Sequence, residues 1–373
     1  MVTPGAESTM ARLGTARAAR SLAGRSSFKR AAPVGLVLAL VLASCGATEA
    51  PTASEPGDAD GELTAITVVR PNPSVVNMFN LCSAWGEGYF AEEGLEISTE
   101  AVDGVSPVLQ ALIADRAEIG VPAAGPVLLA RGQASGPDQE PVMFYNHFAQ
   151  STYGLVVPED SEYQQPADLA DTTVGVGTAD GAEVFFVRSI LTDAGLEAGT
   201  DYEILPVGDG GPALAAFERG DIQSYAAAVP DMSTLNSQGL PVREITPDEF
   251  LTYFGIGFAA TQTYIDENPE VIEGFARALV RGTEFGLANK EAALAHCAEL
   301  NPEEGANVEA TTALFDIVAE RLRSVDGSPW GVFSPEAWEA WETALIETGE
   351  LAGPVEDLHA AYTNVFAEAA NAE

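Results

Sequence analysis

The sequence predicts an α/β protein with two similar lobes and a helical C-terminal region. Short apolar runs alternate with amphipathic stretches between residues 64 and 259, as in sheets whose strands are joined by helices. Residues 112–119 resemble residues 215–222, and each segment combines a helix end, a tight turn with an acidic residue and the start of a strand. Strand-like runs stop near residue 263, and helical patterns follow. The alternation favours largely parallel sheets.

The expected strands are short runs rich in β-branched and aromatic residues. They are residues 64–69, 95–102, 118–121, 142–148, 154–157, 173–177, 202–207, 224–229 and 254–259. The expected helices have apolar residues three and four positions apart. They are residues 76–90, 107–115, 183–194, 212–219, 269–288, 291–300, 307–323, 335–348 and 355–370. Pro269 falls in the first turn of a helix, where its missing N–H costs nothing.

The N-terminal segment has the pattern of an export signal. Six cations precede the apolar run at residues 34–42, which is too short to span a bilayer as a helix. Leu42-Ala43-Ser44-Cys45 resembles a bacterial lipobox, which implies cleavage before Cys45 and attachment of lipid, including palmitate, to Cys45. We expect residues 1–44 to be a lipoprotein signal peptide. The alternative is a plain signal peptide with an incidental Cys.

Residues 45–62 are expected to be a lipidated, flexible tether. Beyond Cys45 they contain no aromatic and no large aliphatic residue, so they cannot bury a core. Such a tether would hold the folded part outside the cytoplasm and close to the membrane that carries the lipid anchor.

The chain is strongly acidic. Its formal net charge is −39, and the signal segment holds six of its 17 Lys and Arg but one of its 56 Asp and Glu. The remaining 11 cations and 55 acids give a net charge of −44. This balance argues against nucleic acid as a partner and against direct attraction to an anionic membrane surface.

The residues that commonly carry catalysis or bind metals form no recognised pattern. The three His residues lack metal-ligand spacing, and the sequence has no Gly-x-Ser-x-Gly elbow and no Walker loop. We therefore expect no catalytic residue, no metal and no cofactor. Cys82 and Cys297 could pair in an oxidising compartment, but two separately buried thiols are favoured.

Four motifs resemble those of one known family, in order and at sensible spacing over about residues 64–300. They are Gly88-Tyr89-Phe90 with Glu93-Gly94-Leu95, Ala117-Glu118-Ile119-Gly120, Pro166-Ala167-Asp168-Leu169 with Val174-Gly175-Val176, and Asn268-Pro269-Glu270. The chain resembles the solute-binding proteins of ABC importers for sulfonates, nitrate, taurine and thiamine-precursor pyrimidines.

The resemblance implies a type II periplasmic-binding-protein-like fold, which is a two-lobed Venus flytrap that closes around its ligand. Lobe 1 would comprise residues 63–157 and 255–373, and lobe 2 residues 158–254. The implied partners are ABC permease subunits and a small molecule, either sulfonate-, nitrate- or taurine-like or a pyrimidine-like heterocycle. We expect a monomer.

The candidate site residues follow the expected strands or flank the first crossover between lobes, because ligands of open α/β sheets bind beyond the carboxyl ends of strands. They are Ser74, Asn77, Ser106, Ala123, Ala124, His147, Tyr153, Asp180, Gly181, Ala182, Asp209 and Asp231. Ser106 is expected to be an N-cap, with Pro107 at the first helical position.

The candidate residues leave the ligand's charge open. Asp180 disfavours a simple oxyanion, and with Asp209 and Asp231 it favours a cation or a hydrogen-bonding heterocycle. His147 and Tyr153 either touch the ligand or pack in the hinge, whereas Trp341 is expected to pack C-terminal helices.

Two other functions stay open. One is an enzyme on the same scaffold, like the pyrimidine synthases that carry a dense Cys cluster, of which this chain has only Cys82. The other is a lipoprotein that senses a ligand and reports it to a membrane partner.

Overall fold

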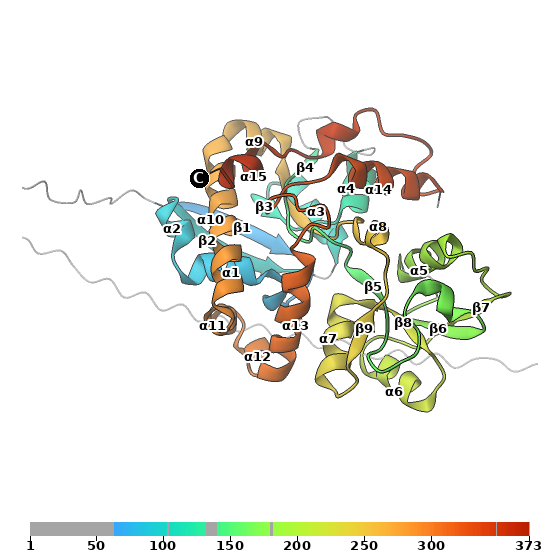
Figure 1. Ribbon diagram of the computed structural model, residues 1–373. Helices are drawn as coiled ribbons and strands as arrows, with labels where there is room; N and C mark the ends of the chain where they lie inside the picture. The colour runs from blue at the N-terminus through green and yellow to red at the C-terminus, as the bar shows by residue number, and fades with distance from the viewer. Residues whose placement is uncertain (1–62, 103, 132–139, 180–181, 348, 373) are drawn as a thin grey trace, which may run out of the picture. The chain divides into compact units, whose positions relative to one another are not determined.

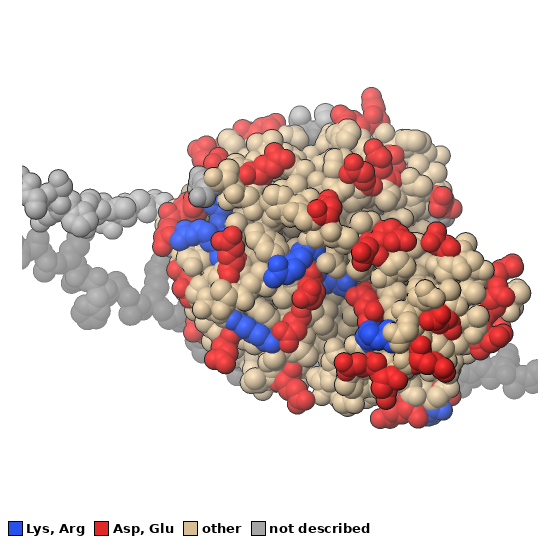
Figure 2. All heavy atoms as spheres, in the orientation of Figure 1, with Lys and Arg blue, Asp and Glu red and all other residues tan. Residues whose placement is uncertain are grey.

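The computed structural model describes residues 63–102, 104–131, 140–179, 182–347 and 349–372 (Figure 1). The expected signal peptide, the tether and Cys45 lie outside these residues, so those expectations stay predictions. A search of the described helices finds none that is long and apolar enough to cross a membrane. Acidic side chains are spread over the visible face of the molecule, with few Lys and Arg among them (Figure 2).

The first sheet has the strand order β2-β1-β3-β10-β4. β1 pairs in parallel with β2 and β3, whereas β10 runs antiparallel to β3 and β4. The strands are β1 (Thr64–Arg70), β2 (Leu95–Ala101), β3 (Ile119–Gly120), β4 (Pro141–Asn146) and β10 (Gly257–Thr261).

The second sheet repeats this design, with the order β7-β6-β8-β5-β9. β6 pairs in parallel with β7 and β8, and β5 runs antiparallel to β8 and β9. The strands are β5 (Tyr153–Pro158), β6 (Thr172–Val176), β7 (Tyr202–Pro206), β8 (Ser224–Ala228) and β9 (Val242–Glu244). Both sheets are mixed but largely parallel in direction: in each, only the strand that arrives from the other sheet, β10 or β5, runs against the others.

Helices join and cover these strands. Up to the second crossover they are η1 (Val76–Met78), α1 (Phe79–Gly86), α2 (Tyr89–Glu92), α3 (Val105–Ile113), α4 (Ala124–Arg131), η3 (Pro166–Leu169), α5 (Ala182–Asp193), α6 (Gly211–Arg219), α7 (Val229–Ser237) and α8 (Asp248–Leu251). After β10 they are α9 (Gln262–Glu267), α10 (Pro269–Ala288), α11 (Lys290–Leu300), α12 (Pro302–Gly305), α13 (Val308–Arg321), α14 (Pro335–Glu347), η4 (Leu358–Ala361) and α15 (Val365–Ala370). α1 and α10 lie side by side (Figure 1).

The repeated segment of the sequence occupies matching places in the two sheets. α3 ends just before Asp115, whose φ is 49°, and β3 follows; α6 ends at Gly220, whose φ is 73°, and β8 follows. In each case a positive-φ residue turns the chain from a helix into the strand beside the first parallel strand. The expected similarity of two βαβ units is thus confirmed.

Several expected elements need correction. The helix expected at residues 76–90 breaks before Gly88, whose φ of 79° suits glycine. β10 begins at Gly257, three residues after the expected start, because the segment before it packs Phe254 into the core. β5 pairs with β8 and β9 of the second sheet over its whole length, whereas the expected first lobe runs to residue 157.

Cys82 and Cys297 form a disulfide bond, whereas the sequence favoured two separate thiols. α1 and α11 pack together and bring the two Cα atoms to 5.0 Å, a separation that suits a disulfide. Both residues are fully buried. The two Cys residues are 215 residues apart in the sequence, and this spacing does not predict that α1 and α11 pack together. For that reason the sequence favours two separate thiols.

Candidate ligand-binding site

The loops at the carboxyl ends of β6, β7 and β8 meet around one cavity, which we call the acidic pocket. It contains three of the expected site residues, Tyr153, Asp209 and Asp231. The full lining is Tyr153, Gly177, Thr178, Glu183, Asp209, Tyr225, Ala226, Ala228, Pro230 and Asp231. The expected convergence of these loops on one crevice is therefore present in the second sheet.

Backbone N–H groups hold the carboxylates of the acidic pocket in place. Asp231 accepts hydrogen bonds from the N–H of Gly210 at 2.8 Å and from that of Ala228 at 3.1 Å, which caps the start of α7. Glu183 accepts from the N–H of Thr178 at 3.0 Å. These side chains thus occupy backbone donors that an anionic ligand would otherwise use.

The electrostatics of the acidic pocket disfavour added negative charge. Burial raises the pKa of Asp231, two backbone hydrogen bonds oppose this shift, and the charges of Asp209 and Glu183 add to it. Burial also raises the pKa of the Tyr225 hydroxyl, with further contributions from the same three carboxylates. Tyr225 donates to the Asp209 carboxylate at 3.4 Å.

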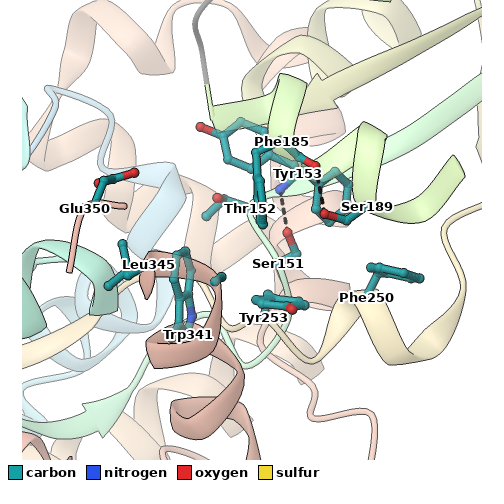
Figure 3. A pocket seen from close by; sticks show the side chains of 12 residues that line it. Ser151, Thr152, Tyr153, Phe185, Ser189, Phe250, Tyr253, Trp341, Leu345 and Glu350 are labelled. Carbon is teal, nitrogen blue, oxygen red and sulfur yellow. Dashed lines mark hydrogen bonds between the residues drawn. The ribbon is translucent and has the colours of Figure 1, made fainter. Parts of the chain in front are cut away.

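A second cavity, the aromatic pocket, shares the lining residue Tyr153 with the acidic pocket. Figure 3 shows the side chains that line the aromatic pocket. They come from the first crossover, β5, α5, α8, α14 and the segments that follow α8 and α14. The residues are Ser151, Thr152, Tyr153, Phe185, Phe186, Ser189, Phe250, Tyr253, Trp341, Ala344, Leu345 and Glu350.

Internal contacts fix the rings of the aromatic pocket. Trp341 donates its indole N–H to the carbonyl of Phe254 at 3.1 Å and lies 5.9 Å from Tyr253, centroid to centroid. Tyr153 and Phe186 lie 6.0 Å apart in the same way. Burial raises the pKa of Tyr153, and the charges of Glu183, Asp231 and Asp209 raise it further. The field of the acidic pocket therefore reaches the aromatic pocket.

The loop after β1 is closed by the protein itself. Glu304, on α12, accepts hydrogen bonds from the Ser74 hydroxyl, from the N–H of Val75 at 2.8 Å and from that of Val76 at 3.4 Å. Ser74 is thus already used within the chain. Asn77 is buried, and its carbonyl oxygen accepts a hydrogen bond from His147. A ligand contact by Ser74 or Asn77 stays a prediction.

His147 directly follows β4, at the start of the first crossover, and is buried. It is 1% exposed, its Nε2 donates to the carbonyl of Asn77 at 2.8 Å, and its Nδ1 accepts from the amide of Asn80 at 3.4 Å. Burial lowers its pKa to about 4, so the ring is neutral at neutral pH. Of the two expectations for His147, this geometry matches packing in the hinge.

The remaining candidates lie elsewhere. Ser106 is not an N-cap: Gly104 caps α3, so the helix starts at Val105 and Pro107 is its third residue. Ala124 is fully buried at the start of α4, and Ala123 forms a β-bridge with Ile256. Asp180 and Gly181 lie outside the described residues, as does the side chain of Ala182.

Sequence reasoning missed most of the residues that line the two pockets. Glu183 and Tyr225 were absent from the candidates, as were the rings contributed by α5, α8 and α14. The usable signal was Phe185-Phe186 directly after the loop that follows β6, at the start of a helix. Trp341, which was expected only to pack C-terminal helices, lies against Phe254 and also lines the cavity.

Solved structures of known proteins share the fold. The periplasmic aliphatic sulphonate-binding protein SsuA from Escherichia coli aligns with a TM-score of 0.56 and 19% identity, covering 80% of this chain and 91% of that one. The desulfurization enzyme DszB, in complex with biphenyl-2-sulfinic acid, aligns with a TM-score of 0.55 and 15% identity, covering 83% and 99%. The architecture is therefore the two-lobed α/β fold of periplasmic binding proteins.

The family model described as NMT1/THI5 like matches residues 76–293, and the chain belongs to this family. Among curated proteins, it is 22% identical to the riboflavin-binding protein RibY of Chloroflexus aurantiacus, over 90% of this chain and 97% of that protein. It is 26% identical to the formylaminopyrimidine-binding protein of Halalkalibacterium halodurans, over 82% of this chain and 90% of that protein.

Proposed function

We propose that this protein is the extracytoplasmic solute-binding subunit of an ABC importer. It captures a small organic ligand between its two lobes and delivers it to permease subunits. The observation that carries the proposal is a pair of pockets that share Tyr153: the acidic pocket lies at the carboxyl ends of β6, β7 and β8, and the aromatic pocket is lined by second-lobe residues together with α14 of the first lobe. A cavity bordered by both lobes suits a ligand that shifts the balance between open and closed forms.

The lining of the pockets favours a ring-bearing ligand over a sulfonate or nitrate. Among the described lining residues there is no Lys, Arg or His, and three carboxylates surround the acidic pocket. The backbone donors near them already hydrogen-bond to those carboxylates. An oxyanion would meet repulsion and few free donors, whereas a heterocycle gains stacking and can donate N–H groups.

Binding without turnover is the first candidate because the curated relatives, at 22% and 26% identity, are binding proteins. The likeness to DszB keeps an enzyme on this scaffold as the second candidate. Incubation of the protein with each bound compound, followed by mass spectrometry, separates the two functions: a binding protein returns the compound unchanged, and an enzyme yields a product of different mass.

The ligand itself tests the proposal. Native mass spectrometry of the protein purified from its own host should show a small molecule that is released on denaturation. Saturation with that molecule, at about 100 times its Kd, should stabilise the fold by roughly 2.7 kcal/mol. The proposal fails if no compound is retained and if flavins, pyrimidines, amines, sulfonates and nitrate all leave the melting curve unchanged.

Attachment to the membrane through Cys45 is part of the proposal and has its own test. In the native host, the protein should partition with membranes, and the variant C45S should lose the lipid mass and leave the membrane fraction. S44A serves as the matched control, because it changes a neighbouring residue and keeps the thiol. Equal membrane partitioning of C45S and the parent protein would contradict the anchor.

A further inference from the structure

The aromatic pocket recognises its occupant mainly through ring faces. Six rings line it, contributed by Tyr153, Phe185, Phe186, Phe250, Tyr253 and Trp341. Two of its polar groups are used inside the protein: the Ser189 hydroxyl donates to the carbonyl of Phe185 at 3.0 Å, and the Ser151 hydroxyl accepts from the N–H of Tyr153 at 3.1 Å (Figure 3). Such a lining holds an apolar or aromatic body, and its π-faces attract a positive charge.

The charges around the two pockets have one sign. Glu350 borders the aromatic pocket, and Glu183, Asp209 and Asp231 border the acidic pocket. Neither set of described lining residues includes a cationic side chain. Tyr153 belongs to both pockets, so a molecule bound against its ring lies within the field of the carboxylates. Desolvating a cation there is compensated by ring faces and carboxylates together, whereas an anion gains neither.

We propose that the ligand of this protein is an organic cation with an apolar or aromatic body. The body lies among the rings of the aromatic pocket, and the cationic nitrogen lies beside Tyr153, toward Glu183, Asp209 and Asp231. This inference rests on the proposed function and adds the ligand's charge class. Steering by the acidic surface raises the encounter rate of such a ligand and lowers that of an anion.

A series of three probes tests the charge directly. Benzamidine, benzamide and benzoate share one ring and nearly one shape, but at neutral pH they are cationic, neutral and anionic. Calorimetric titration of the purified protein should show benzamidine binding roughly tenfold or more tightly than benzamide, and benzoate not binding measurably. Phenyltrimethylammonium, a cation without N–H donors, should also bind more tightly than benzamide.

Two variants localise the effect. D209N removes one charge from the acidic pocket and should weaken benzamidine roughly threefold to tenfold while leaving benzamide unchanged. D221N is the matched control, because it removes the same charge from an exposed turn after α6, outside both pockets. Asp209 hydrogen-bonds only to Tyr225 among the described residues, so D209N should keep the melting temperature of the parent.

The outcomes separate this inference from the proposed function. Equal affinity for benzamidine and benzamide, tighter binding of benzoate, or equal effects of D209N and D221N would each overturn the cation inference. So would failure of all the probes to bind. A neutral or anionic compound retained from the native host would also overturn it, but the solute-binding function would stand. Only the absence of any bound or stabilising compound would overturn both.

Discussion

The two sheets have the same strand order, but the loops that follow the carboxyl ends of their strands differ. After β1, Glu304 closes the loop by accepting hydrogen bonds from Ser74, Val75 and Val76. After β6, β7 and β8, the loops surround the acidic pocket. One edge is sealed by a carboxylate from a distant helix, and the other is open and lined by carboxylates.

In this acidic chain, Asp and Glu side chains occupy backbone N–H groups that could otherwise bind an anionic ligand. At both edges, backbone N–H groups that are suited to an anionic ligand donate to Glu or Asp side chains instead. Few donors are then left for an external anion, and the carboxylates repel it. The shared fold of the two sheets therefore leaves the ligand's charge open, and we propose that the side chains that cap the loops determine it.

The largest expected effect comes from removing the Cys82–Cys297 bond, which holds α11, and with it Glu304 on α12, against α1. The double variant C82S/C297S should lose roughly 2–5 kcal/mol of unfolding free energy, because the bond closes a very long loop in the unfolded chain. Urea denaturation with and without reductant measures this loss. Reductant should destabilise the parent and leave the double variant unchanged; a parent insensitive to complete reduction would contradict the role of the bond.

The next effect concerns His147, which joins the sealed loop to the crossover between the sheets. Its folded pKa of about 4 lies below the ordinary value of 6.5. Between these values the unfolded chain binds a proton that the folded chain does not, so stability is complete above pH 6.5 and falls as the pH drops toward 4. The total loss should be about 3 kcal/mol.

The variant H147Q separates the contribution of His147 to the pH dependence of stability from that of the carboxylates, which titrate in the same pH range. Its amide can donate to the carbonyl of Asn77 as His147 does, but it binds no proton. Denaturation curves at several pH values should therefore show a shallower loss of stability for H147Q than for the parent. Parallel pH dependences would contradict the assignment of the proton to His147.

A smaller effect is expected from removing the Glu304 carboxylate, which closes the loop after β1. E304A should cost roughly 1–2 kcal/mol, because it leaves three donors at the start of η1 without their acceptor. Added acetate should recover part of the loss in E304A by occupying the vacated donors. E303A, which truncates an exposed neighbour on the same helix, should be neutral and unaffected by acetate. Equal responses of the two variants to acetate would contradict the seal.

The sequence predicted those parts of the fold that depend on local pattern. Alternating apolar runs located most strands, and the repeated segment predicted the similar design of α3 with β3 and of α6 with β8. β9 was not predicted, because its three half-buried residues show almost no alternation of apolar and polar side chains. α7 was not predicted, because the apolar run of β8 continues into Val229-Pro230. The change from strand to helix at this point depends on capping by Asp231.

The site was harder to predict because its contacts are not local. Asp209 and Asp231 were found since each follows a strand, a place that the fold itself marks as a loop. Glu304 lies 230 residues from Ser74, so no spacing rule connects them. The aromatic pocket likewise joins α5 with α14, and Trp341 looks like core in any helical pattern. Packing of distant helices decides both features.

The central claim is that this chain's own carboxylates occupy its anion sites, so that its pockets hold a ring-bearing ligand that is not an anion. The most direct measurement is to weigh and identify, by native mass spectrometry, the small molecule that the protein retains when purified from its own host. The account predicts a cationic compound with an apolar or aromatic body. A retained sulfonate, nitrate or carboxylate without a cationic group would contradict it.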